Sequence, residues 1–242
     1  MRRLLIVIVG CLAAAAAEAE DWSGGYIGIS AGGFKGRSTW STTQLGPDTA
    51  VICPGFCLSS TEAKFSDANG YIAGGHFGYN WLFGGHLLFG LEAGVGGSNA
   101  RGSLHYTPGY IATDSTDEIT ATYEYNGGAV ARLGVVAGPV MLYGVGGPWW
   151  QKVSIRYNCT AGTNSWCLTP QTENKADVLR GYTAGGGLEV RVASRVSTRL
   201  EYRYAKYEDK DYTFFSKSAT DTVFARTGAK TYTVSLGVSY RF

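Results

Sequence analysis

Long apolar segments are nearly absent from this chain of 242 residues. After residue 17, no apolar run approaches the roughly 20 residues that a membrane-spanning helix needs. Charge and proline are scarce as well, with 17% Asp, Glu, Lys and Arg and only 6 prolines beside 35 glycines. This glycine has no triplet period, so collagen is excluded. The net charge of +2 comes without a basic block or acidic tail, and nothing indicates a nucleic-acid partner.

The one apolar run lies at the start of the chain. Leu4–Ala17 follows Arg2 and Arg3, and the triplet Ala17-Glu18-Ala19 ends it with a small-x-small pattern. This order predicts a secretory signal peptide over residues 1–19. Residues 20–242 are then the mature domain, in an oxidising compartment.

Four cysteines lie in the mature domain as two close pairs, Cys53 with Cys57 and Cys159 with Cys167. An even number in an oxidising compartment predicts disulfides. Four cysteines allow three connectivities, and pairing within each segment is the simplest geometry. A zinc site is the alternative, but the spacings are irregular and no histidine stands near either pair. We expect no metal or cofactor.

The clearest secondary-structure signal is alternation with period two. Over residues 231–242, apolar side chains alternate without a break with small or polar ones. Residues 196–205 repeat the pattern with Arg and Glu on the polar side. This predicts strands with one apolar and one polar face. In a membrane barrel the apolar face points to lipid and the charged face fills the lumen.

Six further segments bring the number of predicted strands to eight. Four alternate visibly, over residues 71–81, 87–95, 123–135 and 182–192. Two others, near Gly24–Lys35 and Val140–Ile155, are diluted by glycine, and their inward face stays open. In the segment 123–135, Tyr123 and Tyr125 are expected to face lipid and Glu124 the lumen.

Short and long connections alternate strictly. The short ones are Leu82–His86, Gly138-Pro139 and Ala193–Arg195, and the long ones are Arg37–Ala68, Gly102–Asp117, Tyr157–Ala176 and Glu208–Ala229. Outer-membrane barrels have such short periplasmic turns and long outer loops. Backbone groups in hydrocarbon must be bonded internally, which requires closure. The sequence therefore predicts an all-β, eight-stranded antiparallel up-and-down transmembrane β-barrel over residues 20–242.

Aromatic residues near the strand ends are candidates for the girdles at the two membrane interfaces. They are Trp22, Trp81, Tyr143, Trp149, Tyr204, Tyr240 and Phe242. The last long connection, around Asp209–Gly228, is itself rich in aromatics. It is either a contact surface or an extension of the strands as a hairpin.

Eight charged residues are predicted to meet in the lumen, four acids and four arginines. They are Glu92, Glu124, Arg132, Glu189, Arg191, Arg199, Glu201 and Arg203. Paired Arg and carboxylate groups suit a buried site, because unpaired buried charge is costly. An eight-stranded barrel is only just wide enough for its own side chains. We therefore expect a structural plug, with a selectivity filter of a narrow solute channel as the alternative.

Several segments, in their order, resemble the small alphaproteobacterial outer-membrane proteins grouped with opacity proteins and OmpA-like β-barrel domains. The matching segments are Trp22–Gly28, Ala73–Trp81, Leu142–Gly147, Gly181–Glu189, Leu200–Tyr204 and Val238–Phe242. The resemblance implies a barrel of the bacterial outer membrane, in a family whose members are labelled porin, surface antigen or hemin-binding protein. The chain departs from the family in its two cysteine pairs. The ending Leu236, Val238, Tyr240 and Phe242 is similar to the signal that the barrel-assembly machinery reads.

Few residues of the chain are candidates for catalysis or for binding a cofactor. His76 is predicted inside the barrel, His86 in a turn and His105 at the start of a loop, and none has a serine and a carboxylate placed for a triad. Enzymatic activity is therefore not expected. Hemin binding by outer loops is a further alternative, with His105, Tyr106, Tyr110, Tyr157 and Tyr212 as candidates by residue type alone.

The sequence thus favours a structural and surface-interaction barrel. Its expected partners are outer-membrane lipid, the assembly machinery and, through the loops, an extracellular ligand or host surface.

Overall fold

The computed structural model describes residues 22–46, 61–110, 116–160, 165, 167–218 and 221–242. The predicted signal peptide and the Cys53/Cys57 pair lie outside these residues. Among the described residues, none belongs to a helix that is long and apolar enough to cross a membrane.

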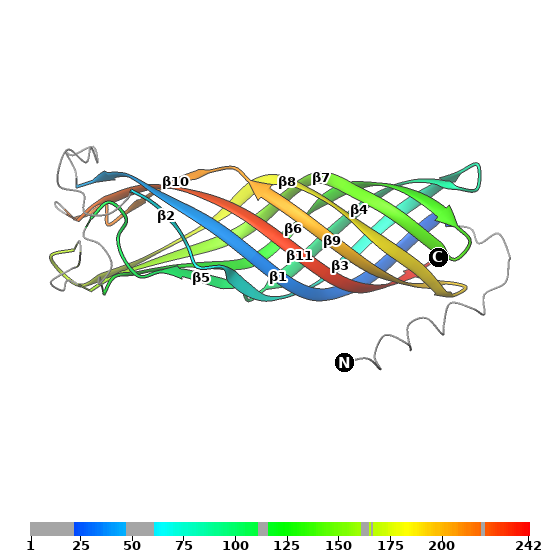
Figure 1. Cartoon of the computed structure of the whole chain (residues 1–242), viewed down its shortest axis with the longest axis horizontal. Coiled ribbons are helices and arrows are strands. Elements are labelled where there is room, and N and C mark those ends of the chain that lie inside the picture. Colours follow the sequence, from blue (N-terminus) through cyan, green and yellow to red (C-terminus); the bar gives the residue numbers. More distant parts are fainter. Residues whose placement is uncertain (1–21, 47–60, 111–115, 161–164, 166, 219–220) are drawn as a thin grey trace, which may run out of the picture.

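Eight antiparallel strands close into one elongated barrel (Figure 1). They are β1 (Gly24–Leu45), β3 (Ala68–Phe83), β4 (Leu87–Ser98), β6 (Glu118–Ala137), β7 (Val140–Cys159), β8 (Gln171–Ala193), β9 (Val196–Tyr207) and β11 (Val223–Arg241). Each pairs with its neighbours in this order, and β11 closes on β1 from Tyr26↔Arg241 to Leu45↔Val223. The predicted fold class is confirmed.

Three tight turns join strands at the end of the barrel where the described chain begins and ends (Figure 1). They fall where the sequence predicts them. Gly84, Gly85 and Gly138 each have positive φ, between 58° and 76°. A side chain is strained in that conformation, so glycine is needed at these turn positions.

The opposite, outer end contains more strand than the sequence predicts. β1 continues to Leu45 and β8 begins at Gln171, inside two connections that were expected to be loops. Three short strands add to this end: β2 (Glu62–Lys64), β5 (Arg101–Leu104) and β10 (Lys210–Phe214). β10 pairs with β11, so the last connection does extend the sheet as a hairpin. The predicted loop boundaries are wrong because the sheet continues past the membrane.

Apolar side chains face outward along the membrane-spanning part. Val234, Leu236 and Val238 of β11 are 52%, 68% and 47% exposed on the barrel exterior, whereas Ser239 between Val238 and Tyr240 is buried in the lumen. The exposed side of a closed barrel is the lipid side, and burial in lipid costs apolar groups nothing. The alternation in the sequence therefore predicts the faces of β9 and β11 correctly.

A β-bulge in β6 reverses the expected faces over part of that strand. Pairing with β7 shifts register between Tyr123 and Asn126, where two residues oppose one. Beyond the bulge Tyr123 is fully buried inside, while Tyr125 stays exposed outside. Glu124 consequently points outward, where Lys152 lies 2.9 Å away. Strict alternation through the bulge was the wrong assumption.

The predicted aromatic girdle divides between the two faces. Trp81, Tyr240 and Phe242 lie on the outer surface near the turns, and Tyr204 faces outward near the other interface. Trp22 and Tyr143 are instead buried in the lumen. Trp149 also lies on the lumen side, with the guanidinium of Arg203 5.1 Å from its ring centroid. Further outward aromatics complete the ring on the loop side: Tyr71, Tyr125, Trp150, Tyr182 and Tyr202. The girdle prediction is thus right for Trp81, Tyr204, Tyr240 and Phe242 and wrong for Trp22, Tyr143 and Trp149.

Leu236 lies midway between Tyr232 and Tyr240 on the lipid face of β11. Replacing it with Arg should lower the free energy of unfolding by about 2–4 kcal/mol, the cost of a cation at the bilayer midplane. Denaturant titration of the protein in lipid vesicles measures this. Leu236→Met is the matched control and should leave stability unchanged. Equal stabilities of the two variants would contradict the assignment of the lipid face.

Candidate functional site

The lumen contains a layer of buried ion pairs at the level of the membrane. This ion-pair layer consists of Glu92, Arg132, Glu189, Arg199, Glu201 and Arg203, from β4, β6, β8 and β9. Within it three arginines face three glutamates, and a fourth arginine, Arg241, lies 4.0 Å from Glu189. The side chains are 14% exposed or less, which makes this the most strongly desolvated charge cluster among the described residues.

Glu92 is the centre of the layer. Its Oε2 accepts a hydrogen bond from Arg199 Nη1 at 2.6 Å, and its Oε1 accepts one from Arg203 Nη2 at 2.7 Å. Tyr26 Oη donates to Oε2 as well, at 3.0 Å. Arg203 also donates through Nε to Glu201, at 2.5 Å. A carboxylate from β4 thus binds arginines from β9 across the lumen, and charge-assisted hydrogen bonds of this kind are the strong ones.

Arg132 forms the second centre. Its Nη2 donates to Glu189 at 2.8 Å, and its Nη1 donates to Tyr26 Oη at 2.7 Å. The guanidinium lies over the ring of Tyr143, with its carbon 4.1 Å from the ring centroid. Such stacking stabilises a desolvated cation. Tyr143 Oη donates onward to Glu201, at 2.8 Å, which connects the two centres.

Two glycines make room for the lumen tyrosines. A Cβ at Gly78 would lie 2.5 Å from Tyr26 Oη, and one at Gly187 would lie 2.6 Å from Tyr143 Oη. Real Cβ atoms do not approach other atoms so closely. Part of the glycine content therefore has a local reason. Gly78 and Gly187 are the register partners of Tyr26 and Tyr143, so each phenol ring lies over a neighbouring strand that has no side chain at that position.

The structure brings together six of the eight predicted lumen charges. Glu124 is a correction, because the bulge in β6 turns it outward to Lys152 and Ser154. Arg191 is not in the ion-pair layer either. It lies nearer the turns, with its guanidinium 4.8 Å from the ring centroid of Trp22.

A hydrophobic seal closes the lumen on the side of the turns. Trp22 is fully buried there and packs with Leu88, Val136 and Met141. Its Nε1 donates to the carbonyl of Gly138 at 3.0 Å, and the guanidinium of Arg241 lies 5.0 Å from its ring centroid. This end of the barrel is therefore filled by an indole ring that is fixed by a turn.

An aromatic cap fills the lumen on the outer side. It consists of Trp40, Phe65, Tyr157, Phe214 and Phe215, with ring centroids 5.0 to 6.4 Å apart. Smaller apolar residues such as Ile119 and Val223 surround it. Between this cap and the ion-pair layer lies a small polar cavity, lined among others by His76, Thr183 and Ser235. His76 is inside the barrel as predicted, with Nε2 2.9 Å from Ser239 Oγ.

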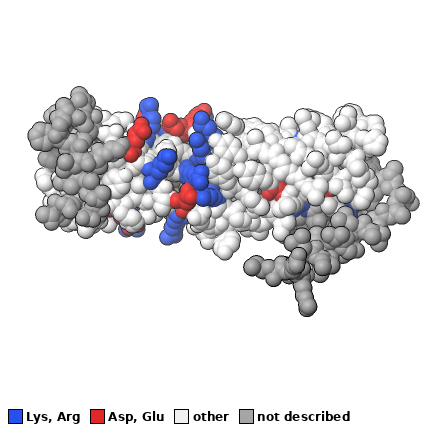
Figure 2. Space-filling model, in the orientation of Figure 1, with Lys and Arg blue, Asp and Glu red and all other residues white. Residues whose placement is uncertain are grey.

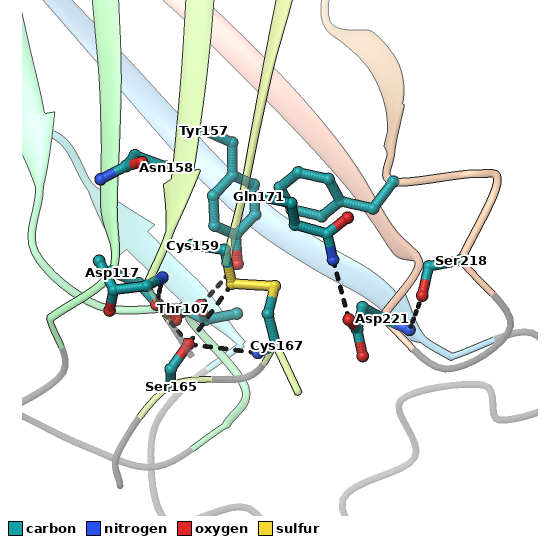
Figure 3. Close-up of a disulfide and its surroundings, with 12 residues drawn as sticks. Thr107, Asp117, Tyr157, Asn158, Cys159, Ser165, Cys167, Gln171, Ser218 and Asp221 are labelled. Atoms are coloured by element: carbon teal, nitrogen blue, oxygen red, sulfur yellow. Dashed lines mark hydrogen bonds between the residues drawn. A yellow bond between two sulfur atoms is a disulfide. The ribbon is translucent and has the colours of Figure 1, made fainter. Parts of the chain in front are cut away.

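Asp117 organises the outer rim beside a disulfide (Figure 3). Its carboxylate is buried and accepts hydrogen bonds from Ser165 Oγ at 2.6 Å and from Thr107 Oγ1 at 2.9 Å. Cys159 and Cys167 form the disulfide, as local pairing predicts. One carboxylate and one crosslink thus join the β5–β6 and β7–β8 connections to the rim.

The residues considered for hemin are distributed unfavourably. Tyr157 and Tyr212 are buried, and Tyr157 Oη is 2.5 Å from Thr107 Oγ1. Burial raises the pKa of Tyr157, so its phenol stays neutral inside the aromatic cap. His105 is exposed, with Nε2 3.2 Å from Ser103 Oγ. Tyr106 and Tyr110 are partly buried against the same apolar cluster that contains Tyr157 and Tyr212, so these four tyrosines contribute to the packing of the outer end.

Sequence reasoning missed several lumen residues: Trp22, Tyr26, Tyr143, Trp149 and Arg241. Arg241 had a visible signal, since it stands on the polar face of an alternating strand. Tyr26 and Tyr143 lie on the two glycine-diluted strands, where alternation gives no clear inward face. Only the opposing Gly78 and Gly187 explain why large rings point inward there.

An eight-stranded barrel with apolar side chains outward and a charged, filled lumen defines the class: a small β-barrel of the bacterial outer membrane. The chain belongs to the family described as outer membrane protein beta-barrel domain, whose model matches residues 4–242. The resemblance noted in the sequence is confirmed.

Relatives of known location agree with this class. The chain is 31% identical over 180 residues to a 22 kDa outer membrane protein of Rhizobium leguminosarum bv. viciae, covering 73% of this chain and 70% of that protein. It is 28% identical over 233 residues to a 31 kDa outer-membrane immunogenic protein of Brucella melitensis, covering 95% and 87%. The solved structure of the outer membrane protein OprG from Pseudomonas aeruginosa has the same fold, with a TM-score of 0.56 at 11% identity, covering 93% of this chain and 100% of that one.

The two glutamates Glu92 and Glu124 provide a matched test of the lumen. Glu92→Gln leaves Arg199 and Arg203 buried without their carboxylate, and we expect the free energy of unfolding to fall by about 3–5 kcal/mol. Glu124→Gln removes an exposed pair and should cost at most about 1 kcal/mol. Urea titration in lipid vesicles measures both. The reverse order, or equal losses, would contradict the placement of these two residues.

Proposed function

We propose that this protein is a closed, non-catalytic barrel that stabilises the outer membrane and presents its outer rim to the surroundings. The observation that carries the proposal is the filling of the lumen in three successive parts. The seal around Trp22, the ion-pair layer and the aromatic cap close the described lumen at three successive levels, with a small cavity between the layer and the cap.

The ion-pair layer supports a structural role over a selectivity filter. A selectivity filter needs charged groups that are free to bind a passing solute. Here Glu92 is already hydrogen-bonded to Arg199 and Tyr26, and Arg132 is hydrogen-bonded to Glu189 and Tyr26. Its hydrogen bonds also connect strands that are not adjacent in the sheet. Losing any of these pairs would leave a charge unpaired in a desolvated site, which is costly. The layer therefore stiffens the barrel.

The outer rim supports the second half of the proposal. Rigid scaffolds commonly carry recognition on their loops. Here the sheet continues beyond the membrane, and a disulfide and a buried carboxylate hold the rim in place. The Brucella relative is named an immunogenic outer-membrane protein, which fits a rim that is accessible from outside the cell.

Planar-bilayer recording tests the closed lumen. We expect no steady, reproducible single-channel steps from the refolded protein, because side chains occupy the bore. A sixteen-stranded porin inserted under the same conditions serves as the positive control, since its lumen is an aqueous channel. Uniform steps that scale with protein insertion would overturn the closed scaffold in favour of a narrow solute channel.

Labelling of intact cells tests the exposed rim. Lys217 is exposed in the connection after β10, so Lys217→Cys should react with a membrane-impermeant maleimide on whole cells. Arg195 lies in the turn between β8 and β9, and Arg195→Cys should react only after the outer membrane is permeabilised. The unsubstituted protein gives the background. Labelling of Arg195→Cys alone on intact cells would mean that the barrel has the opposite orientation.

A further inference from the structure

Three cations stand in one row on the outside of the barrel, on the adjacent strands β1, β11 and β9. Arg37 is the register partner of Lys230, and Lys230 is the partner of Lys206. All three residues are exposed. Like charges directly opposite each other destabilise a sheet. Such a row therefore requires a compensating anion or a functional reason.

Acidic residues near the row do not compensate for it. Asp67 is 3.1 Å from Arg37 and 2.5 Å from Lys35, so one carboxylate serves two cations. Among the described residues, neither Lys206 nor Lys230 has an ion-pair partner within 4 Å.

The row lines a surface groove with an excess of positive charge. Its charged lining residues are Arg37, Lys64, Lys206 and Lys230 against Asp67 and Asp209. On the face that Figure 2 presents, basic and acidic side chains gather in a band across the barrel, whereas the surface toward the turns is nearly free of charge. The groove therefore favours an anion.

The height of the row relative to the membrane identifies the kind of anion. Two residues closer to the membrane, Lys35, Tyr232 and Tyr204 form the next outward row, and the two tyrosine rings are 5.3 Å apart. Interfacial aromatics mark the boundary of the hydrocarbon. Two residues along a tilted strand place the three cations roughly 5 Å farther out. This is the level of lipid headgroups in the outer leaflet.

We propose that Arg37, Lys206 and Lys230 bind the phosphate groups of a phosphorylated glycolipid of the outer leaflet. Lys206 and Lys230 supply point charges that have no protein partner. Arg37 is positioned by Asp67 and lies over the ring of Tyr232, 5.5 Å from its centroid. Its guanidinium offers paired donors, which match phosphate oxygens. Tyr204 and Tyr232 contact the apolar part of the same lipid below.

Native mass spectrometry of the detergent-solubilised full chain with bisphosphorylated lipid A tests this site. The wild-type protein should retain the lipid, and Lys206→Gln with Lys230→Gln should bind it about 30-fold more weakly, which corresponds to about 2 kcal/mol for two lysines near an anionic surface. Dephosphorylated lipid A with the same acyl chains should bind weakly to both. Heat-modifiable migration on gels verifies that each variant is folded.

Two control variants keep the result specific. Lys206→Arg with Lys230→Arg preserves the charge and should retain the lipid. Lys175→Gln with Lys217→Gln removes two cations from the outer end, away from the groove, and should also retain it.

Equal retention by wild type and the Lys206/Lys230 glutamine variant would overturn the proposal. So would equal binding of phosphorylated and dephosphorylated lipid. If the glutamine variant kept the lipid but lost binding to soluble polyglutamate, the groove would recognise an acidic polypeptide and the proposal would be wrong.

Discussion

Hydrogen bonding of the backbone in hydrocarbon is the constraint on which this structure depends. A sheet in lipid leaves edge N–H and C=O groups without water, so it must close. Pairing of β11 with β1 achieves that closure over nearly the whole length of both strands. Once the ring is closed, each strand has one face toward lipid and one toward a narrow interior. The positions of apolar, charged and glycine residues follow from this division.

The narrow interior imposes its own requirements. Eight strands leave a bore that side chains fill, and a polar face in that bore must satisfy itself. Here Glu92 and Arg132 meet their partners from across the lumen, and Tyr26 and Tyr143 supply hydroxyls and ring faces between them. The tyrosines fit because their register partners on the neighbouring strands, Gly78 and Gly187, are glycines. The charged side chains, the phenol rings and the glycines therefore pack together in the lumen. This packing allows a chain with few charges to bury six of them inside the barrel.

Beyond the membrane, the lumen of the barrel is filled by apolar side chains instead of ion pairs. Water is available outside the sheet there, and the lumen can hold an apolar core like that of a soluble protein. Trp40, Tyr157 and Phe214 form this core, while basic and acidic side chains gather on the exterior (Figure 2). The bulge in β6 lies at this transition, since it admits Tyr123 to the core and turns Glu124 toward the surface. The row of cations on β1, β11 and β9 lies at the same transition, where lipid headgroups meet the protein.

The sequence by itself determined the closed eight-stranded barrel, its turns and the faces of β9 and β11, because period-two alternation is a local property of a strand. It also indicated most of the ion-pair layer, since Arg and Glu on a lipid-spanning strand have only the lumen to occupy. Tertiary structure decided the rest. A single inserted residue in β6 turns the side chain of Glu124 from the lumen to the outer face, and nothing local in the sequence distinguishes a bulge from regular strand. The inward rings of Tyr26 and Tyr143 depend on the glycines paired with them on neighbouring strands. Trp22 and the outer core depend on apolar partners that come from several strands, so only the folded barrel decides their burial.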